Sequence, residues 1–194
     1  MRRAIFILTI LFVAVLSTAC INNIAVQELN NAAKSYMEKG DYNSAIDRLE
    51  SSLELDSTVY ETYYNLGVAC IEAKEFQKAI DYLTKAISLN PKCADAYYTI
   101  AVAQESLADS YSAKHEDVEV GLNQDGEISH SEVVYNSISD ADKELMIQGY
   151  LTAISNYRKY SEMSNSDKKS EEIAIHIADV EKVLSKLGYS GSTL

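Results

Sequence analysis

The stretch from Tyr60 to Pro91 constrains the fold of this chain more than any other. Its apolar residues recur with a helical period in two segments, which predicts two amphipathic helices joined by a tight turn. Small residues stand where the two helices would cross, and Pro91 closes the unit. Larger apolar residues fill the space around the crossing. The small residues are Gly67, Ala79 and Ala86, and the larger ones are Tyr63, Leu66, Phe76 and Leu83.

The same pattern returns 34 residues away in both directions. Towards the N-terminus, Ala79-Ile80-Asp81 becomes Ala45-Ile46-Asp47, so a second copy precedes the first. Towards the C-terminus, Tyr63-Tyr64 becomes Tyr97-Tyr98, which begins a third copy. Its second helix returns late, as Ala153-Ile154 followed by Tyr157, so an insertion of roughly 40 residues splits the third copy.

This order resembles the tetratricopeptide repeat (TPR), whose pattern is an aromatic, Leu-Gly, a second aromatic, Ala, an apolar residue, Ala and Pro. Cys70 stands where that family prefers the second aromatic, and the other hallmark positions match. The resemblance implies an all-α fold, a TPR helical-hairpin solenoid of about three repeats with a C-terminal capping helix. We expect the TPR domain over 26–187 and a tail at 188–194. Within the domain, the repeats are 26–59, 60–93 and 94–107 plus 147–166, the insertion is 108–146, and the capping helix is 168–187.

The first twenty residues have the pattern of a secretory signal. Arg2 and Arg3 precede an apolar run that is short for a membrane-spanning helix, and small residues follow up to Cys20. The ending resembles a bacterial lipobox, which implies a signal peptide at 1–19, lipidation at Cys20 and a lipid-anchored tether at 20–25. Plain secretion and an uncleaved anchor remain alternatives. We therefore expect a lipid-anchored protein of the bacterial cell envelope, facing the periplasm or the exterior.

The net charge restricts the kinds of partner, and the cysteines restrict the possible disulfides. The formal net charge is −12, and an acidic surface repels phosphate backbones, so we expect no nucleic-acid partner. Besides Cys20 the chain has Cys70 and Cys93, which the repeat packing does not obviously bring together. We expect two packed thiols rather than a disulfide.

Three short motifs predict helix starts. Thr58-x-x-Glu61 has the spacing of a capping box for the helix beginning near Tyr60. Asn90-Pro91 predicts a cap followed by proline at the first helical position of the third repeat. Ser139-x-x-Asp142, near the end of the insertion, predicts the start of a helix that runs to about Met163.

The resemblance also implies a binding surface, because the first helices of stacked repeats form a concave groove. Its centre would be tyrosine and valine with an acidic rim, suited to an extended or helical peptide with apolar anchors and basic flanks. The alternative is that the last helix or the insertion fills the groove and these residues are only core. The expected partner-binding residues are Asn30, Lys34, Tyr64, Val68, Ile71, Tyr98, Val102 and Glu105.

The insertion contains a second candidate site. Residues 121–132 resemble an EF-hand loop, with Asn123, Asp125 and Glu132 at liganding places, but Gly121 stands where the first carboxylate belongs. A hairpin turn is the preferred interpretation, so we expect no cofactor, with calcium as the alternative. His115 and His130 also lie there, and a solvated acidic loop is preferred to a metal site.

No arrangement of nucleophile, base and phosphate loop stands out, so we expect no enzyme. The sequence thus predicts a protein–protein interaction scaffold of the bacterial envelope that binds a partner protein or peptide in its concave groove. Two alternatives are a calcium-responsive binding protein that uses 121–132 and an accessory subunit of an envelope enzyme.

Overall fold

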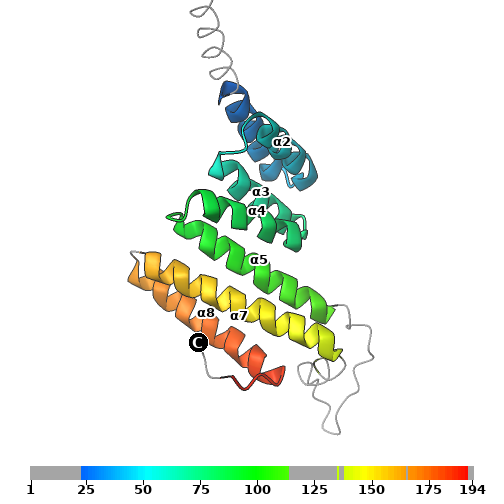
Figure 1. Ribbon diagram of the computed structural model, residues 1–194, viewed down its shortest axis with the longest axis vertical. Coiled ribbons are helices and arrows are strands. Elements are labelled where there is room, and N and C mark those ends of the chain that lie inside the picture. The colour runs from blue at the N-terminus through cyan, green and yellow to red at the C-terminus, as the bar shows by residue number, and fades with distance from the viewer. Residues whose placement is uncertain (1–22, 114–134, 136–137, 165, 192–194) are drawn as a thin grey trace, which may run out of the picture.

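The chain forms a stack of antiparallel helices (Figure 1). The computed structural model describes residues 23–113, 135, 138–164 and 166–191. Across these residues the regular structure is helical throughout, as predicted. The helices are an N-terminal helix at 23–38, α2 (Tyr42–Leu55), α3 (Tyr60–Glu72), α4 (Phe76–Leu89), α5 (Ala94–Ala113), α7 (Asp140–Met163) and α8 (Asp167–Lys186).

Consecutive helices pair and then stack on the next pair. The N-terminal helix pairs with α2, α3 with α4, and α5 with α7, and α8 packs on α7 as a final helix. The first helices of neighbouring hairpins also touch, since α3 contacts α5. The split third repeat is therefore real: α5 and α7 lie side by side although many residues separate them in sequence (Figure 1).

The α3–α4 crossing depends on a missing side chain. A Cβ atom on Gly67 would lie 2.4 Å from Cγ of Leu83, which is completely buried. Glycine therefore lets the two helices approach closely, as the sequence predicted. Ala79 and Ala86 on α4 are also completely buried.

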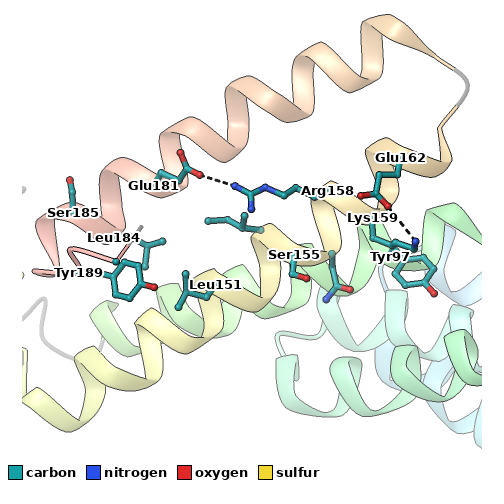
Figure 2. A pocket seen from close by; sticks show the side chains of 13 residues that line it. Tyr97, Leu151, Ser155, Arg158, Lys159, Glu162, Glu181, Leu184, Ser185 and Tyr189 are labelled. Atoms are coloured by element: carbon teal, nitrogen blue, oxygen red, sulfur yellow. Dashed lines mark hydrogen bonds and ion pairs between the residues drawn. The ribbon is translucent and has the colours of Figure 1, made fainter. Parts of the chain in front are cut away.

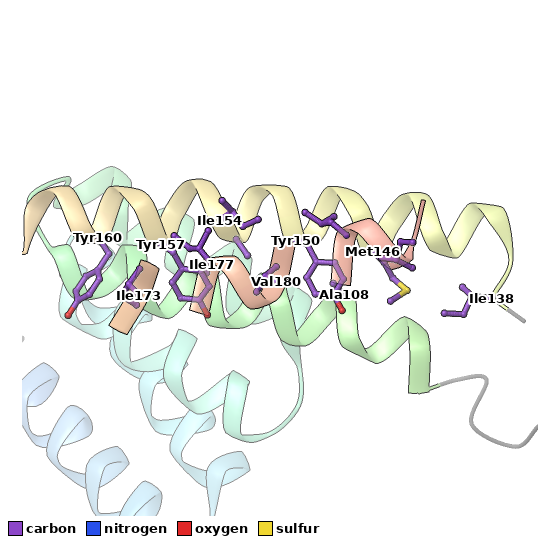
Figure 3. Packing of buried hydrophobic residues seen from close by; sticks show 14 residues of the cluster. Ala108, Ile138, Met146, Tyr150, Ile154, Tyr157, Tyr160, Ile173, Ile177 and Val180 are labelled. Atoms are coloured by element: carbon purple, nitrogen blue, oxygen red, sulfur yellow. The ribbon is translucent and has the colours of Figure 1, made fainter. Parts of the chain in front are cut away.

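Two apolar clusters hold the stack together. The first joins the N-terminal helix, α2, α3 and α4, and takes Ile100 and Ala103 from α5. The second joins α5, α7 and α8, with Ile173, Ile177 and Val180 of α8 packed against Tyr150 and Tyr157 of α7 (Figure 3). Because α5 contributes to both clusters, it connects the two halves of the solenoid.

The helices of the split repeat are longer than the predicted repeat segments, 94–107 and 147–166. Ala108 and Met146 are buried in the α5–α7 contact, so the apolar faces of both helices continue into the predicted insertion 108–146. The N-terminal helix already includes 23–25, which the sequence assigned to a tether. The last helix, predicted over 168–187, is α8; it ends at Lys186 with Leu187 as its C-cap, and Gly188 follows with a φ of +85° that suits glycine.

Two of the predicted caps are wrong. Thr58 donates its hydroxyl to Asp56 Oδ1 at 2.6 Å, and α3 begins after Val59 without a side-chain cap. Asn90 ends α4, and its side-chain oxygen accepts the Lys92 amide at 3.2 Å, so α5 begins only at Ala94. In both cases a closer partner, the Asp56 carboxylate for Thr58 and the Lys92 amide for Asn90, occupies the expected capping group. Ser139 caps α7 as predicted by accepting from the Asp142 amide.

The cysteines of the body are free thiols, as expected. Cys70 is completely buried beneath α4, and Cys93 is half-buried in the turn before α5. Burial raises the pKa of the Cys70 thiol to about 11.

Candidate functional site

The concave side of the stack contains a hollow of about 940 Å³ between α3, α5 and α8. Helical spacing brings its residues together, because positions three and four apart share one face. On both α3 and α5 this face carries a tyrosine, a valine four residues later, and a third residue three positions after the valine. Six of the eight predicted groove residues line this hollow: Tyr64, Val68, Ile71, Tyr98, Val102 and Glu105.

The other two predicted residues line a neighbouring hollow of about 660 Å³. Asn30 and Lys34 of the N-terminal helix face Val68 and Glu72 of α3 there. Val68 and Glu72 line both hollows, so the two form one continuous groove along the first helices of the repeats. The structure thus brings all eight predicted residues to one surface.

Asn30 has a structural task within that surface. Its amide nitrogen lies 2.9 Å from Val26 O, 2.9 Å from Ser52 Oγ and 3.2 Å from Thr62 Oγ1. Ser52 of α2 and Thr62 of α3 are completely buried, so Asn30 supplies the polar partner that these hydroxyls need. It therefore joins three helices at the floor of the groove.

One wall of the larger hollow was missed by the sequence reasoning. Lys169, Glu172, Ile173 and His176 of α8 line it, spaced so that they share one helix face. This spacing could have identified them, but α8 has no counterpart in the repeat register, and it was predicted only to cap the stack or to fill the groove.

The helix α8 closes one side of the groove without filling it. Tyr157 is buried beneath it, whereas Tyr98 keeps 42% of its surface exposed and Val102 is half-buried. The groove is therefore filled where α8 covers Tyr157 and open where Tyr98 and Val102 remain accessible. The opening lies over Tyr98 and Val102.

Aromatic rings gather around Tyr98. Its ring centroid lies 5.7 Å from that of Tyr157 and 5.3 Å from that of Tyr160. Such tilted and edge contacts are favourable for aromatic pairs and hold the exposed ring in place. Tyr98 thus offers a preorganised aromatic surface to the hollow.

A polar network anchors the groove to α8. Glu105 accepts the Tyr157 hydroxyl at 2.8 Å, and one of its oxygens lies 2.8 Å from His176 Nε2. Burial and the Glu105 carboxylate raise the pKa of Tyr157, so its hydroxyl stays protonated and donates. On the next turn of α5, Asp109 accepts the Tyr150 hydroxyl.

The lining of the larger hollow is acidic. Five carboxylates, those of Glu72, Asp95, Glu105, Asp109 and Glu172, face one lysine, Lys169, with His176 beside them. Neither Glu72 nor Asp95 forms an ion pair within the described ranges, and both residues are exposed. The groove therefore presents a negative potential to whatever enters it.

A second cleft, of about 690 Å³, opens between α7 and α8 (Figure 2). Its lining includes the apolar and aromatic side chains of Tyr97, Leu151, Leu184 and Tyr189. Arg158, also in the lining, forms an ion pair with Glu181, with 3.2 Å between the nitrogen and the oxygen. Tyr97 precedes Tyr98 on α5, so adjacent tyrosines face different cavities. Sequence reasoning did not identify this cleft.

Several predicted features lie outside the described residues. They are the signal peptide 1–19 with Cys20, the loop 121–132, and His115 and His130. Among the helices that the structure does describe, none combines the length and hydropathy needed to cross a bilayer. In the same residues no cluster of three or more His, Cys, Asp or Glu side chains could hold a metal ion.

Known families and structures match this architecture. The family described as "Tetratricopeptide repeat" matches residues 60–93, and "TPR repeat" matches residues 33–72. Among curated proteins none matches the sequence. Residues 33–93 are therefore tetratricopeptide repeats, as the 34-residue period predicted.

Solved TPR domains share the fold over most of both chains. The first TPR domain of human RPAP3 superimposes with a TM-score of 0.57 at 17% identity, covering 86% of this chain and 97% of that one. The Arabidopsis OM64 TPR domain gives 0.57 at 16% identity, covering 81% and 98%. The Sgt2 TPR domain from Aspergillus fumigatus gives 0.56 at 15% identity, covering 87% of each chain.

These likenesses establish the fold: the chain folds as a TPR-like helical solenoid.

Proposed function

We propose that this protein is an interaction scaffold that takes a segment of a partner protein into the concave groove. The observation that carries the proposal is the exposed Tyr98 ring, fixed by Tyr157 and Tyr160 at the opening of a hollow of about 940 Å³. Tyrosine supplies a large contact area at a small cost in side-chain entropy, and such residues dominate binding surfaces.

Similar structures support a peptide as the ligand. The first TPR domain of Spaghetti (RPAP3), which has a TM-score of 0.56 and 17% identity with this chain, is described as bound to the HSP90 peptide SRMEEVD. The second TPR domain of human RPAP3 is described as a complex with an HSP70 peptide. In the present chain, the first helices of the repeats form the corresponding concave surface.

We further propose that the scaffold works at the bacterial cell envelope. The support is the charged, apolar and small-residue pattern ending at Cys20. Lipidation of Cys20 would hold the groove close to a membrane, because few residues separate Cys20 from the N-terminal helix. A Cys20→Ala variant should lose fatty-acid labelling and leave the membrane fraction. A variant that stays membrane-bound, with no label in either form, would end this proposal.

The chain offers a matched test of the groove. Tyr64 and Tyr98 are equivalent in the two repeats, and both line the larger hollow. The residues just before them, Tyr63 and Tyr97, are also equivalent to each other, but neither lines this hollow. We expect the Tyr64→Ala and Tyr98→Ala double variant to lose a crosslinked partner from membranes. The Tyr63→Ala and Tyr97→Ala double variant should keep it, provided circular dichroism shows both variants helical.

The reverse pattern would contradict the proposal. If the Tyr63 and Tyr97 pair is needed and the Tyr64 and Tyr98 pair is not, the partner binds outside the groove. The cleft of Figure 2, which Tyr97 lines, would then be the place of binding.

A further inference from the structure

We infer that the segment held in the groove is basic, with two lysine or arginine residues separated by about four or five positions and an apolar residue between them. This inference rests on the proposed function, because it identifies the ligand of the same groove. It follows from the position of each acidic group along the hollow.

The first step is charge complementarity. Of the five carboxylates that line the larger hollow, Glu172 forms an ion pair with Lys168 at 3.8 Å, and Glu105 lies 2.8 Å from His176. Glu72 and Asp95 are exposed without an ion-pair partner among the residues described. The carboxylates of Glu105 and Asp109 each accept a tyrosine hydroxyl but retain further acceptor sites. An acidic or neutral segment would leave this negative potential unbalanced, whereas a basic one would neutralise it.

The second step is the order of residues along α5. Asp95 lies in the first turn of the helix, and Glu105 lies ten residues later, about 15 Å along the axis. Between them, Tyr98 and Val102 form an aromatic and apolar middle. Along the axis of α5, the larger hollow thus has an acidic position at each end of an uncharged centre.

The neighbouring helix α3 repeats part of this order. On α3, Tyr64 and Val68 stand beside Tyr98 and Val102 in the repeat register, and Tyr64 Oη lies 3.4 Å from Thr99 Oγ1. Glu72 stands beside Ser106 in the same register, so it joins Glu105 at the far end. The acidic and apolar positions therefore belong to the groove as a whole.

The third step converts this spacing into a ligand pattern. An extended chain advances about 3.3 Å per residue, so about 15 Å corresponds to four or five residues. A basic side chain at each end would meet carboxylates, and the aliphatic part of a lysine or arginine can also lie on the Tyr98 ring. The residue in the middle would contact Val68 and Val102.

The charge of the ligand separates this groove from the similar domains. The peptide named for the first TPR domain of Spaghetti, SRMEEVD, ends in acidic residues. Among the described residues that line the larger hollow, Lys169 is the one lysine or arginine, and Asp95 would repel a carboxylate. We therefore expect such acidic peptides not to bind.

Selection from a random-peptide display library tests the inference on the whole chain. We expect peptides that depend on Tyr64 and Tyr98 to carry two basic residues four or five positions apart around an apolar one. For one such synthetic peptide, Glu72→Gln with Asp95→Asn should weaken binding about threefold to tenfold at low salt, and added salt should weaken it further.

A matched control separates groove charge from net charge. Asp47→Asn with Glu54→Gln removes the same two charges from exposed positions of α2, outside both hollows, and should change the affinity by less than about twofold. Shuffling the peptide so that its basic residues are adjacent should weaken binding to the unchanged protein.

The outcomes distinguish the two proposals. Peptides that need Tyr64 and Tyr98 but are neutral or acidic, or that ignore the Glu72 and Asp95 changes, would overturn the basic ligand and leave the groove as the binding site. If no selected peptide depends on Tyr64 and Tyr98, both the basic ligand and the groove are wrong.

Discussion

At the scale of the residue, Asn30 shows how one side chain can line the groove and also hold the fold. Its amide can give at most two hydrogen atoms to the three acceptors around it, two of which are buried hydroxyls. The residue was predicted as a binding residue. Because of these contacts, a substitution at Asn30 should first affect the stability of the fold.

We expect Asn30→Ala to lower the free energy of unfolding by about 1–3 kcal/mol, because Ser52 and Thr62 would lose a partner while buried. Urea denaturation followed by circular dichroism measures the change. Asn31→Ala is the control, since Asn31 is exposed on the same helix and lines the same hollow. Equal stability of both variants would show that the Asn30 bonds contribute little.

The two cysteines of the body should differ sharply in reactivity. Burial raises the pKa of Cys70 to about 11, so at neutral pH the thiol is almost entirely protonated, and the thiolate is the reactive form. In folded protein, iodoacetamide should therefore modify Cys93 and spare Cys70. Peptide mapping by mass spectrometry measures both sites, with denatured protein as the reference. Fast labelling of Cys70 in the folded chain would contradict its position in the core.

At the scale of the element, the turns of the first two hairpins differ at one position. Gly40 and Lys74 are equivalent in the repeat register, and both have positive φ, +75° and +61°. Glycine adopts this conformation freely, whereas a residue with a Cβ is strained in it. The second hairpin thus keeps the turn geometry despite an unfavourable residue.

Exchanging these residues should shift stability in opposite directions. We expect Lys74→Gly to raise the free energy of unfolding by about 0.5–1 kcal/mol, and Gly40→Lys to lower it by about 1 kcal/mol. Thermal melts of both variants against the unchanged chain give the comparison. A loss of stability in Lys74→Gly would mean that contacts of the lysine side chain outweigh the backbone strain.

The 34-residue register predicts some elements of the fold and not others. Positions such as Gly67 and Ala79 fix the helix crossings, so the hairpins and the split repeat could be derived from the sequence. Two of the three predicted helix starts could not, because capping is a competition among close neighbours: Asp56 binds Thr58, and Asn90 binds Lys92. The α8 wall lies outside the repeat, so the register does not predict that His176 meets Glu105.

At the scale of the whole molecule, the solenoid has two cores that meet at α5. The N-terminal core is built on the repeat register, and the C-terminal core on the longer helices α7 and α8. The groove runs across both, so its shape depends on how α5 is held between them. A ligand that contacts α3 and α8 together would therefore also stabilise the whole stack.

The position of a bound partner tests the central claim most directly. A photo-crosslinking amino acid at Glu72, which lines both hollows, can be compared with one at Asp81, which is exposed on α4 outside them. We predict that illumination of membranes captures one specific partner from Glu72 and none from Asp81. The same partner captured from Asp81 and absent from Glu72 would place the contact on the outer surface and contradict the groove.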